Sequence, residues 1–193
     1  KTAESFVCDV LEECRKFKFK SICFFAILDN ASKDGTIDLM RNLSTQIYEL
    51  NVVYAPENQC VVDAYMRGYR EAINSACDWI LEIDAGYSHQ PSDIPKFFKT
   101  MIQGYDCVFG SRFCPDGKMI DSAKSRYITS LGGTIISNLL LGTKLSDMTS
   151  GFELFKCEVL QNIIDKGILA RGPFFKTEIR AYSHQFRITE VLI

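Results

Sequence analysis

The sequence predicts an α/β fold, with a mainly parallel, Rossmann-like sheet flanked by helices. Short apolar runs alternate with helical patterns through the first half of the chain, which is typical of parallel strands joined by crossover helices. The apolar run 79–83 ends in Asp84 and a small-residue loop, as a buried strand does at the carboxyl edge of a sheet. No linker, repeat or low-complexity segment divides the 193 residues, so residues 1–193 are expected to form a single domain.

Apolar periodicity locates the elements of the first half. Residues at helical spacing predict an amphipathic helix over 1–16, and its apolar stripe is Phe6, Val7, Val10, Leu11 and Cys14. A second helix is expected over 60–76, with one face formed by Val61, Ala64, Tyr65, Gly68 and Ala72. Helices are also expected from about 36 to 43 and from Pro91, because proline suits the first helical turn. The expected strands are 21–28, 51–54, 79–83 and 105–110.

The second half of the chain is less regular. A loop is expected over 112–121, helices over 124–141 and 172–184, and extended segments over 148–155 and 186–193. The apolar run 135–141 has two interpretations. Such a run is more often the buried face of a core helix, but it also suits a helix that lies against a membrane surface.

Composition and charge exclude some classes of protein. Hydrophobic residues make up 47% and charged residues 24% of the chain, as in ordinary globular proteins. The formal net charge of -2 gives no bulk attraction for nucleic acid, so no nucleic-acid partner is expected. No segment has the pattern of a signal peptide or the apolar length needed to span a bilayer.

The eight cysteines indicate a reducing compartment. None forms a Cys-x-x-Cys pair, and several lie inside apolar runs, as Cys23 does between Ile22 and Phe24. Buried, reduced thiols explain this pattern better than a disulfide framework or a zinc site. A cytoplasmic location is therefore expected.

Asp84 is the first candidate for a ligand-binding residue. A carboxylate at the carboxyl edge of a parallel sheet can hold a divalent cation, and the cation can hold a diphosphate. Taken alone, an aspartate that caps a turn is the better interpretation. Motifs elsewhere in the chain change that balance.

Four segments, in this order, resemble the motifs of family 2 glycosyltransferases of the GT-A fold. They are 28–36 (LDNASKDGT), 83–86 (IDAG), 110–113 (GSRF) and 146–152 (SDMTSGF). The branch that they resemble most is that of the dolichyl- or polyprenyl-phosphate mannose synthases, which the segment 88–95 (SHQPSDIP) also resembles. The resemblance covers nearly the whole chain and implies a GT-A fold and hexosyltransferase activity.

The resemblance also implies a nucleotide site. The residues that it assigns to the nucleotide are Asp29, Asn30, Asp63 and Asp84, of which Asp84 would also hold Mg²⁺ or Mn²⁺. The segment 29–36 is equally typical of a helix entry capped by Ser32 or Asp34, and both interpretations can hold together. Asn30 replaces a second acid of the family, so it keeps an acceptor but loses the charge. Cysteine and valine replace family glycines just before Asp63, which favours a first-turn helix acid there over a ligand.

The metal motif departs from the family. Gly86 stands where the family carries the second acid of its Asp-x-Asp motif, and Ser88 where the mannose synthases often carry glutamine. A metal ion held through Asp84 alone would depend on the donor diphosphate, because magnesium keeps several of its waters. His89 is expected to cap or pack the loop. Gly86 also leaves open a site that binds nucleotide without turnover.

The resemblance implies that Arg112, Arg126 and Asp147 are the catalytic residues. It assigns both arginines to phosphates of the donor or of a lipid phosphate acceptor, a role that suits the bidentate guanidinium. A surface salt bridge is the alternative, and for Arg126 the two interpretations are evenly balanced. Asp147 would be the general base for a sugar hydroxyl acceptor, but would only orient groups around an anionic polyprenyl phosphate. A turn acid at a strand edge is the alternative for Asp147.

The expected activity is inverting transfer of a sugar from a GDP-mannose-like donor or a UDP-sugar to a polyprenyl phosphate. The metal and the arginines would stabilise the leaving diphosphate. Transfer to a sugar hydroxyl of a polysaccharide or glycolipid is the rival activity. A lipid acceptor implies peripheral contact at the cytoplasmic membrane face. Because the family opens with a strand before the position of Lys1 and continues past Ile193, a domain incomplete at both ends is expected.

Overall fold

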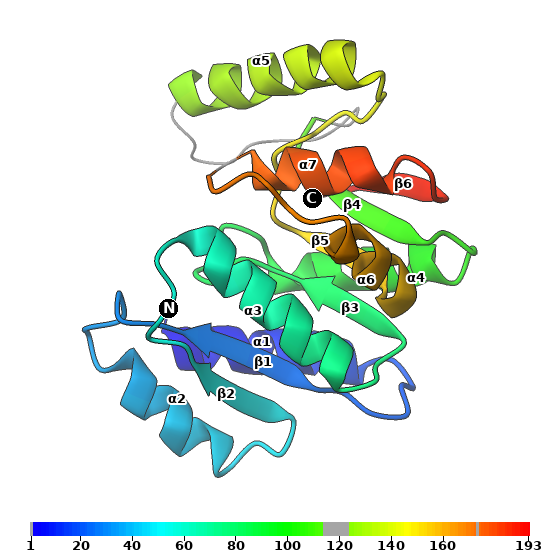
Figure 1. The fold of residues 1–193 in the computed structure, drawn as a ribbon. Helices are drawn as coiled ribbons and strands as arrows, with labels where there is room; N and C mark the ends of the chain where they lie inside the picture. The colour runs from blue at the N-terminus through cyan, green and yellow to red at the C-terminus, as the bar shows by residue number, and fades with distance from the viewer. Residues whose placement is uncertain (1, 114–123, 173) are drawn as a thin grey trace.

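The computed structural model describes residues 2–113, 124–172 and 174–193, and only the backbone of 124–127 (Figure 1). In chain order, the elements are α1 (Ala3–Arg15), β1 (Phe24–Leu28), α2 (Thr36–Ser44), β2 (Leu50–Tyr54), α3 (Val61–Asn74), β3 (Trp79–Glu82), the 3₁₀ turn η1 (Pro91–Asp93), α4 (Ile94–Met101), β4 (Cys107–Ser111), α5 (Lys124–Leu141), β5 (Glu153–Lys156), α6 (Cys157–Asp165), α7 (Phe175–Ser183) and β6 (Ile188–Leu192). Strands and helices alternate in the first half as predicted, and α5 has the predicted bounds.

The strands form two hydrogen-bonded groups. β1 and β2 make a parallel pair, and the other four strands follow the order β3-β5-β4-β6. β5 runs antiparallel to both of its neighbours, whereas β4 and β6 are parallel. Because β3 and β4 both oppose β5, they run in the same direction and their carboxyl ends lie at the same edge.

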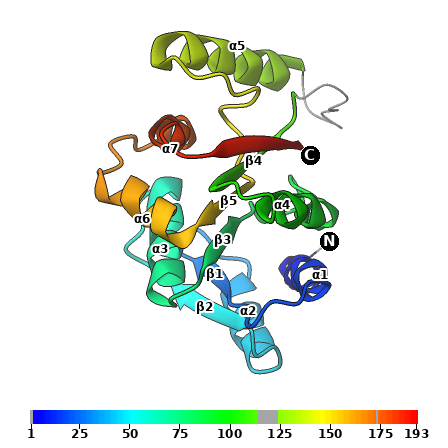
Figure 2. The same ribbon diagram turned by 90° about the vertical axis from the view of Figure 1, so that its right-hand side faces the viewer.

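Helices cover both faces of the strands, which confirms the α/β fold. Figure 2 shows α1 and α4 on one side and α3 and α6 on the other. α3 contacts both β1 and β3, and it comes close to β1 at Gly68, where an added Cβ would lie 3.3 Å from the Ile27 side chain. α5 lies apart at one end of the molecule, beyond α7 (Figures 1 and 2).

Local sequence explains the helices next to the site. Thr2 and Ser5 cap α1 reciprocally, since each side chain accepts a hydrogen bond from the backbone N–H of the other. The predicted apolar stripe of α1 is entirely buried, and part of it packs against Ile94 and Phe97 of α4. Pro91 begins the turn that leads into α4, as predicted.

The observed elements differ from the predicted ones in three details. The buried face of α3 is shifted, because Val61 is 58% exposed whereas Val62 and Tyr69 are buried; two adjacent valines leave the phase of the helix ambiguous. α6 is not among the predicted elements, although its buried residues have helical spacing. Strand β5 is shorter than the predicted 148–155, because the N–H of Met148 bonds to a side chain on α5 instead of a strand.

The described cysteines carry free thiols: Cys8, Cys14, Cys23, Cys60, Cys77, Cys107 and Cys157. Of these, Cys14 and Cys107 are buried. The expectation that Cys23 is buried is wrong. It is exposed, since it lies in the approach to β1 and not within the paired strand. Residues 114–123, which include Cys114 and most of the predicted loop 112–121, lie outside the described part of the chain.

Helix α5 has an inverted distribution of side chains. Its buried face is polar: Thr134 accepts a hydrogen bond from the N–H of Met148 (3.0 Å), and Asn138 donates to the carbonyl of Leu145 (2.7 Å). Its exposed face is apolar and comprises Ile128, Ile135, Ile136, Leu139, Leu140 and Leu141. The core-helix interpretation of the run 135–141 is therefore wrong. Of the helices described, none is both long enough and apolar enough to cross a membrane.

Candidate active site

The predicted site residues lie where strands end. Asp29 follows β1, Asp84 lies two residues beyond β3, and Arg112 follows β4 directly. Asp147 lies in the loop that connects α5 to β5. Since β3 and β4 run in the same direction, Asp84 and Arg112 lie at the same edge of the sheet.

Asp84 is held on three sides. The hydroxyl of Tyr65, from α3, donates a hydrogen bond to Oδ1. Nε2 of His89 lies 3.6 Å from Oδ2, and a Cβ added to Gly151 would lie 2.5 Å from the same oxygen. Only glycine at position 151 therefore leaves room for the carboxylate, whose side chain remains 32% exposed.

Tyr65 and His89 orient this carboxylate, Tyr65 from a half-buried position and His89 from a buried one. Burial, with the hydrogen bond to Asp84, raises the pKa of Tyr65 above its ordinary value, so the phenol stays protonated and donates. His89 is 7% exposed and packs against Phe152, with 5.5 Å between ring centroids. The histidine thus packs the loop, as expected, and also faces Asp84.

The fit of a metal ion to this site rests on Asp84. No group of three or more His, Cys, Asp or Glu side chains is placed to bind a metal within the described ranges. Gly86 adopts φ +92°, a left-handed conformation that favours glycine. The backbone at this position therefore suits the glycine that replaces the family's second acid. One carboxylate suits Mg²⁺ or Mn²⁺ when a diphosphate and waters supply the other ligands. Asp84 fits such an ion in the presence of a donor.

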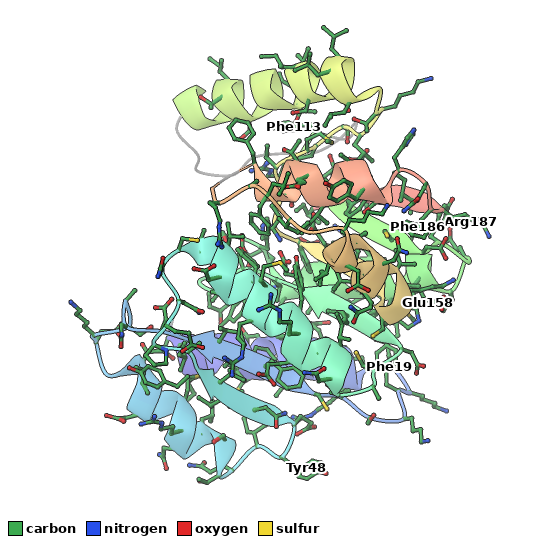
Figure 3. All side chains as sticks on the ribbon, in the orientation of Figure 1. Phe19, Tyr48, Phe113, Glu158, Phe186 and Arg187 are labelled. Atoms are coloured by element: carbon green, nitrogen blue, oxygen red, sulfur yellow. The ribbon has the colours of Figure 1, made fainter. Side chains whose placement is uncertain are left out.

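Arg112 and Asp147 form a bidentate ion pair. Arg112 donates from Nε to Oδ2 at 2.7 Å and from Nη2 to Oδ1 at 2.9 Å, and its backbone N–H lies 3.2 Å from Oδ2. Nη2 also donates to the hydroxyl of Thr149. The guanidinium lies 5.4 Å from the ring centroid of Phe113, a side chain labelled in Figure 3. Asp147 is fully buried, whereas the Arg112 side chain is 20% exposed.

The backbone around Asp147 is also fixed. The N–H groups of Ser146 and Asp147 donate to the carboxylate of Glu190 on β6, at 2.7 and 3.0 Å. Although burial opposes ionisation, the hydrogen bonds and charge of Arg112 lower the pKa of Asp147 to about 2. A carboxylate with so low a pKa is a weak base near neutral pH.

Asp29 and Asn30 organise the turn after β1. Asp29 accepts a hydrogen bond from the N–H of Ala31 at 2.9 Å. Asn30 accepts from the hydroxyl of Tyr54 and donates to the carbonyl of Pro56, so it joins the ends of β1 and β2. Both predicted nucleotide ligands therefore have structural partners at the strand ends.

Asp63 caps the first turn of α3. Its carboxylate accepts hydrogen bonds from the N–H groups of Gln59 and Cys60, at 3.0 and 3.2 Å, and pairs with Arg171 at 2.9 Å. These backbone hydrogen bonds, led by that of Gln59, lower its pKa. The other predicted residue, Arg126, lies on α5, and its side chain is outside the described part of the chain.

Sequence reasoning missed the residues that hold Asp84. Tyr65 was expected only as part of an apolar helix face, and its 19-residue separation from Asp84 carries no local pattern. Gly151 did have a signal, because it lies in the Ser-Gly-Phe part of the motif at 146–152. The structure gives that glycine a steric reason.

The chain matches known glycosyltransferases in sequence. The profile described as "Glycosyl transferase family 2" matches residues 4–164. An undecaprenyl-phosphate mannosyltransferase of Micrococcus luteus is 30% identical over 169 residues, which cover 86% of this chain and 69% of that protein. A polyprenol monophosphomannose synthase of Mycolicibacterium smegmatis is 26% identical over 170 residues, 86% of this chain and 64% of that protein.

Solved structures support the same fold. Glucosyl-3-phosphoglycerate synthase of Mycobacterium tuberculosis, crystallised with Mn²⁺, UDP-glucose and phosphoglyceric acid, superposes with a TM-score of 0.64 at 15% identity. The match covers 99% of this chain and 66% of that one. Together with the profile match over residues 4–164, this likeness identifies the chain as a member of glycosyltransferase family 2, with the GT-A fold.

Proposed function

We propose that the protein transfers a hexose, with inversion, from a nucleotide-diphospho-sugar to a polyprenyl phosphate. The names of the two sequence relatives, an undecaprenyl-phosphate mannosyltransferase and a polyprenol monophosphomannose synthase, support a mannosyl donor and a lipid phosphate acceptor. Within the site, the observation that carries the proposal is the state of Asp147. It is fully buried and paired with Arg112.

The acceptor follows from the chemistry of that pair. A sugar hydroxyl must lose a proton as it attacks, so it needs a general base. Asp147, with a pKa of about 2, is poorly suited to take that proton. A phosphate oxygen is already anionic and needs charge neutralisation instead, which an arginine provides. The geometry of Asp147 therefore favours the phosphate acceptor over the sugar hydroxyl.

The reaction is a single displacement. An oxygen of the acceptor phosphate forms a bond to the anomeric carbon while the bond from that carbon to the donor diphosphate breaks, and the nucleoside diphosphate leaves. Asp84 would hold Mg²⁺ or Mn²⁺ against the diphosphate, where the ion supplies charge neutralisation. The described hydrogen bonds of Arg112 use its N–H, Nε and Nη2, and we assign Nη1 to a phosphate.

Helix α5 supports a lipid-linked acceptor. It joins the segment after Arg112 to the loop that carries Asp147, and its apolar face points away from the protein. The segment 124–146 contains Lys124, Arg126 and Lys144 but no acidic residue. An apolar face with basic residues at its ends suits the surface of an anionic membrane. We propose that α5 lies on the cytoplasmic face of a membrane and receives the isoprenoid chain.

Ligand binding and turnover can test the proposal together. GDP-mannose and UDP-sugars, each with and without Mn²⁺, should be tested for an increase in melting temperature, since a ligand of the native state stabilises it. The stabilising donor is then assayed with a polyprenyl phosphate and with simple sugars. Metal-dependent transfer to the lipid phosphate is the expected result. Binding without turnover would instead favour a non-catalytic nucleotide-sugar module, and transfer to sugars alone would contradict the acceptor.

A further inference from the structure

Two glutamates face each other on the strands next to Asp84. Glu82 of β3 and Glu153 of β5 are partners in the antiparallel pairing, and they are 9% and 0% exposed. Like charges directly opposite on neighbouring strands destabilise a sheet, and burial away from water increases that cost. These positions therefore need a cation that reaches both carboxylates.

Lys176 provides that cation from α7. Its side chain is buried, and Nζ donates to Oε1 of Glu82 and lies 3.3 Å from Oε2 of Glu153. One turn later, Arg180 donates from Nε to Oε1 of Glu153 at 2.9 Å. The cluster thus joins two basic and two acidic side chains, so its formal charges balance. Burial lowers the pKa of Lys176 and raises that of Glu153 to about 7, and the charge and hydrogen bond of Arg180 oppose the shift of Glu153. Burial of four ionisable groups is costly, and the contacts of the cluster show what it holds in place.

The first connection from this cluster to the site passes through Tyr65. Nζ of Lys176 lies 4.2 Å from the centroid of the Tyr65 ring, a favourable cation–π distance. The ring also packs against Phe175, with centroids 4.8 Å apart. The hydroxyl of this ring is the donor to Asp84. The ammonium group therefore restrains the side chain that orients Asp84.

The second connection passes through the backbone. Nη2 of Arg180 donates to the carbonyl of Ser150 at 3.0 Å. Ser150 precedes Gly151, which borders the Asp84 carboxylate. Glu82, the other partner of Lys176, lies two residues before Asp84 on the same strand end. Both segments that flank Asp84 are thus tied to one buried cluster.

We infer that Lys176 is a positioning residue for Asp84, an inference that rests on the proposed role of Asp84 in donor binding. The ammonium group holds Tyr65 and the facing glutamates in one arrangement. That arrangement aims the Asp84 carboxylate before a metal–nucleotide complex binds. Lys176 itself is 4% exposed, so we assign it no contact with donor or acceptor.

The test measures Mn²⁺ binding through the electron paramagnetic resonance signal of the free ion, in the presence of GDP or UDP. Lys176→Met alone would leave two buried glutamates facing each other, so the double variant Lys176→Met/Glu82→Gln is used, because it removes one charge of each sign. We expect it to keep its fold, checked by circular dichroism, while its affinity for Mn²⁺ with nucleotide falls about 10- to 100-fold, as on loss of an outer-shell partner.

A second variant and a control complete the experiment. Tyr65→Phe keeps the charge cluster and removes only the hydroxyl that donates to Asp84, so the same fall in affinity is expected. Lys156→Met is the matched control, because Lys156 also pairs with a carboxylate, Asp106, but away from Asp84; its affinity should be unchanged.

The outcomes distinguish the positioning role of Lys176 from the proposed metal site at Asp84. If the folded double variant or Tyr65→Phe binds Mn²⁺ and nucleotide as tightly as the wild type, the positioning inference is overturned and the proposed function stands. If the wild-type protein shows no nucleotide-dependent Mn²⁺ binding, the proposed metal site fails and the inference fails with it.

Discussion

Arg112 and Asp147 form a bidentate ion pair that fixes both side chains at the edge of the sheet where Asp84 also lies, with N–O distances of 2.7 and 2.9 Å. The pair places the carboxylate out of contact with solvent and leaves the guanidinium partly exposed. An incoming acceptor would therefore meet positive charge before it met a base. This arrangement is the physical basis for preferring an anionic acceptor.

The ion pair should make the free energy of unfolding depend on pH in the acid range. The folded-state pKa of Asp147 is lowered from 3.8 to about 2, so the carboxylate stabilises the fold fully above about pH 4 and loses that contribution as the pH falls through 2. The shift corresponds to roughly 2 kcal/mol. Urea unfolding of wild type and Asp147→Asn measures it. The difference in unfolding free energy between them should be constant from pH 7 to pH 5 and shrink below pH 4; a constant difference down to pH 2 would contradict the assignment.

Asp84 should couple metal binding to donor binding. Asp84→Ala is expected to abolish the Mn²⁺-dependent increase in melting temperature on adding nucleotide-sugar, because the site offers no other carboxylate in that motif. The fold should be kept, since the carboxylate is at the sheet edge. Thermal denaturation with and without Mn²⁺ measures both effects. If the variant responds to donor and metal as the wild type does, Asp84 is only a turn residue.

Gly151→Ala should disturb the same carboxylate without touching it chemically. The added methyl group would lie 2.5 Å from Oδ2 of Asp84, so the carboxylate must move. We expect Mn²⁺-dependent nucleotide binding to weaken about 10- to 100-fold, as for other losses of ligand orientation. Gly133→Ala is the control, because an added Cβ there meets no atom within 4 Å and alanine favours a helix. Equal binding by the two variants would rule out the steric role of Gly151.

The apolar face of α5 should govern attachment to membranes. Leu139 is 82% exposed, and Leu139→Glu places a negative charge in the middle of the proposed contact. Sedimentation with vesicles that contain anionic lipid should therefore show less bound protein for this variant than for the wild type. Ile102→Glu is matched in exposure, at 80%, and Ile102 lies at the C-terminal cap of α4, so the binding of this variant should not change. A similar loss in both variants would point to bulk charge and not to α5.

The parts of the fold that were predictable are those set by local patterns. The apolar stripe of α1 follows from helical periodicity, and Asp84 and Arg112 could be singled out because polar residues followed apolar strands. Which face of α5 is buried could not be predicted in this way. Its inner face is selected by two hydrogen bonds with the loop that follows the helix, one accepted by Thr134 and one donated by Asn138, and these partners decide which side is buried.

Contacts between distant residues explain what else was missed. Arg112 and Asp147 were each candidates, but their pairing across 35 residues leaves no periodic signal. The same is true of Lys176 and Glu82, which are 94 residues apart. A glutamate inside the apolar run 79–83 was nevertheless a visible anomaly, because a buried carboxylate requires a partner. That residue could have indicated the charge cluster.

The most direct test of the proposed function compares Arg126→Ala and Asp147→Asn in turnover with a polyprenyl phosphate and with simple sugar acceptors. With an anionic acceptor, loss of positive charge matters more than loss of a base, so Arg126→Ala should lower the rate on the lipid phosphate more than Asp147→Asn does. Removal of a true general base typically costs about 100- to 10,000-fold. Activity on sugar hydroxyls alone, with Asp147→Asn inactive, would contradict the lipid phosphate acceptor.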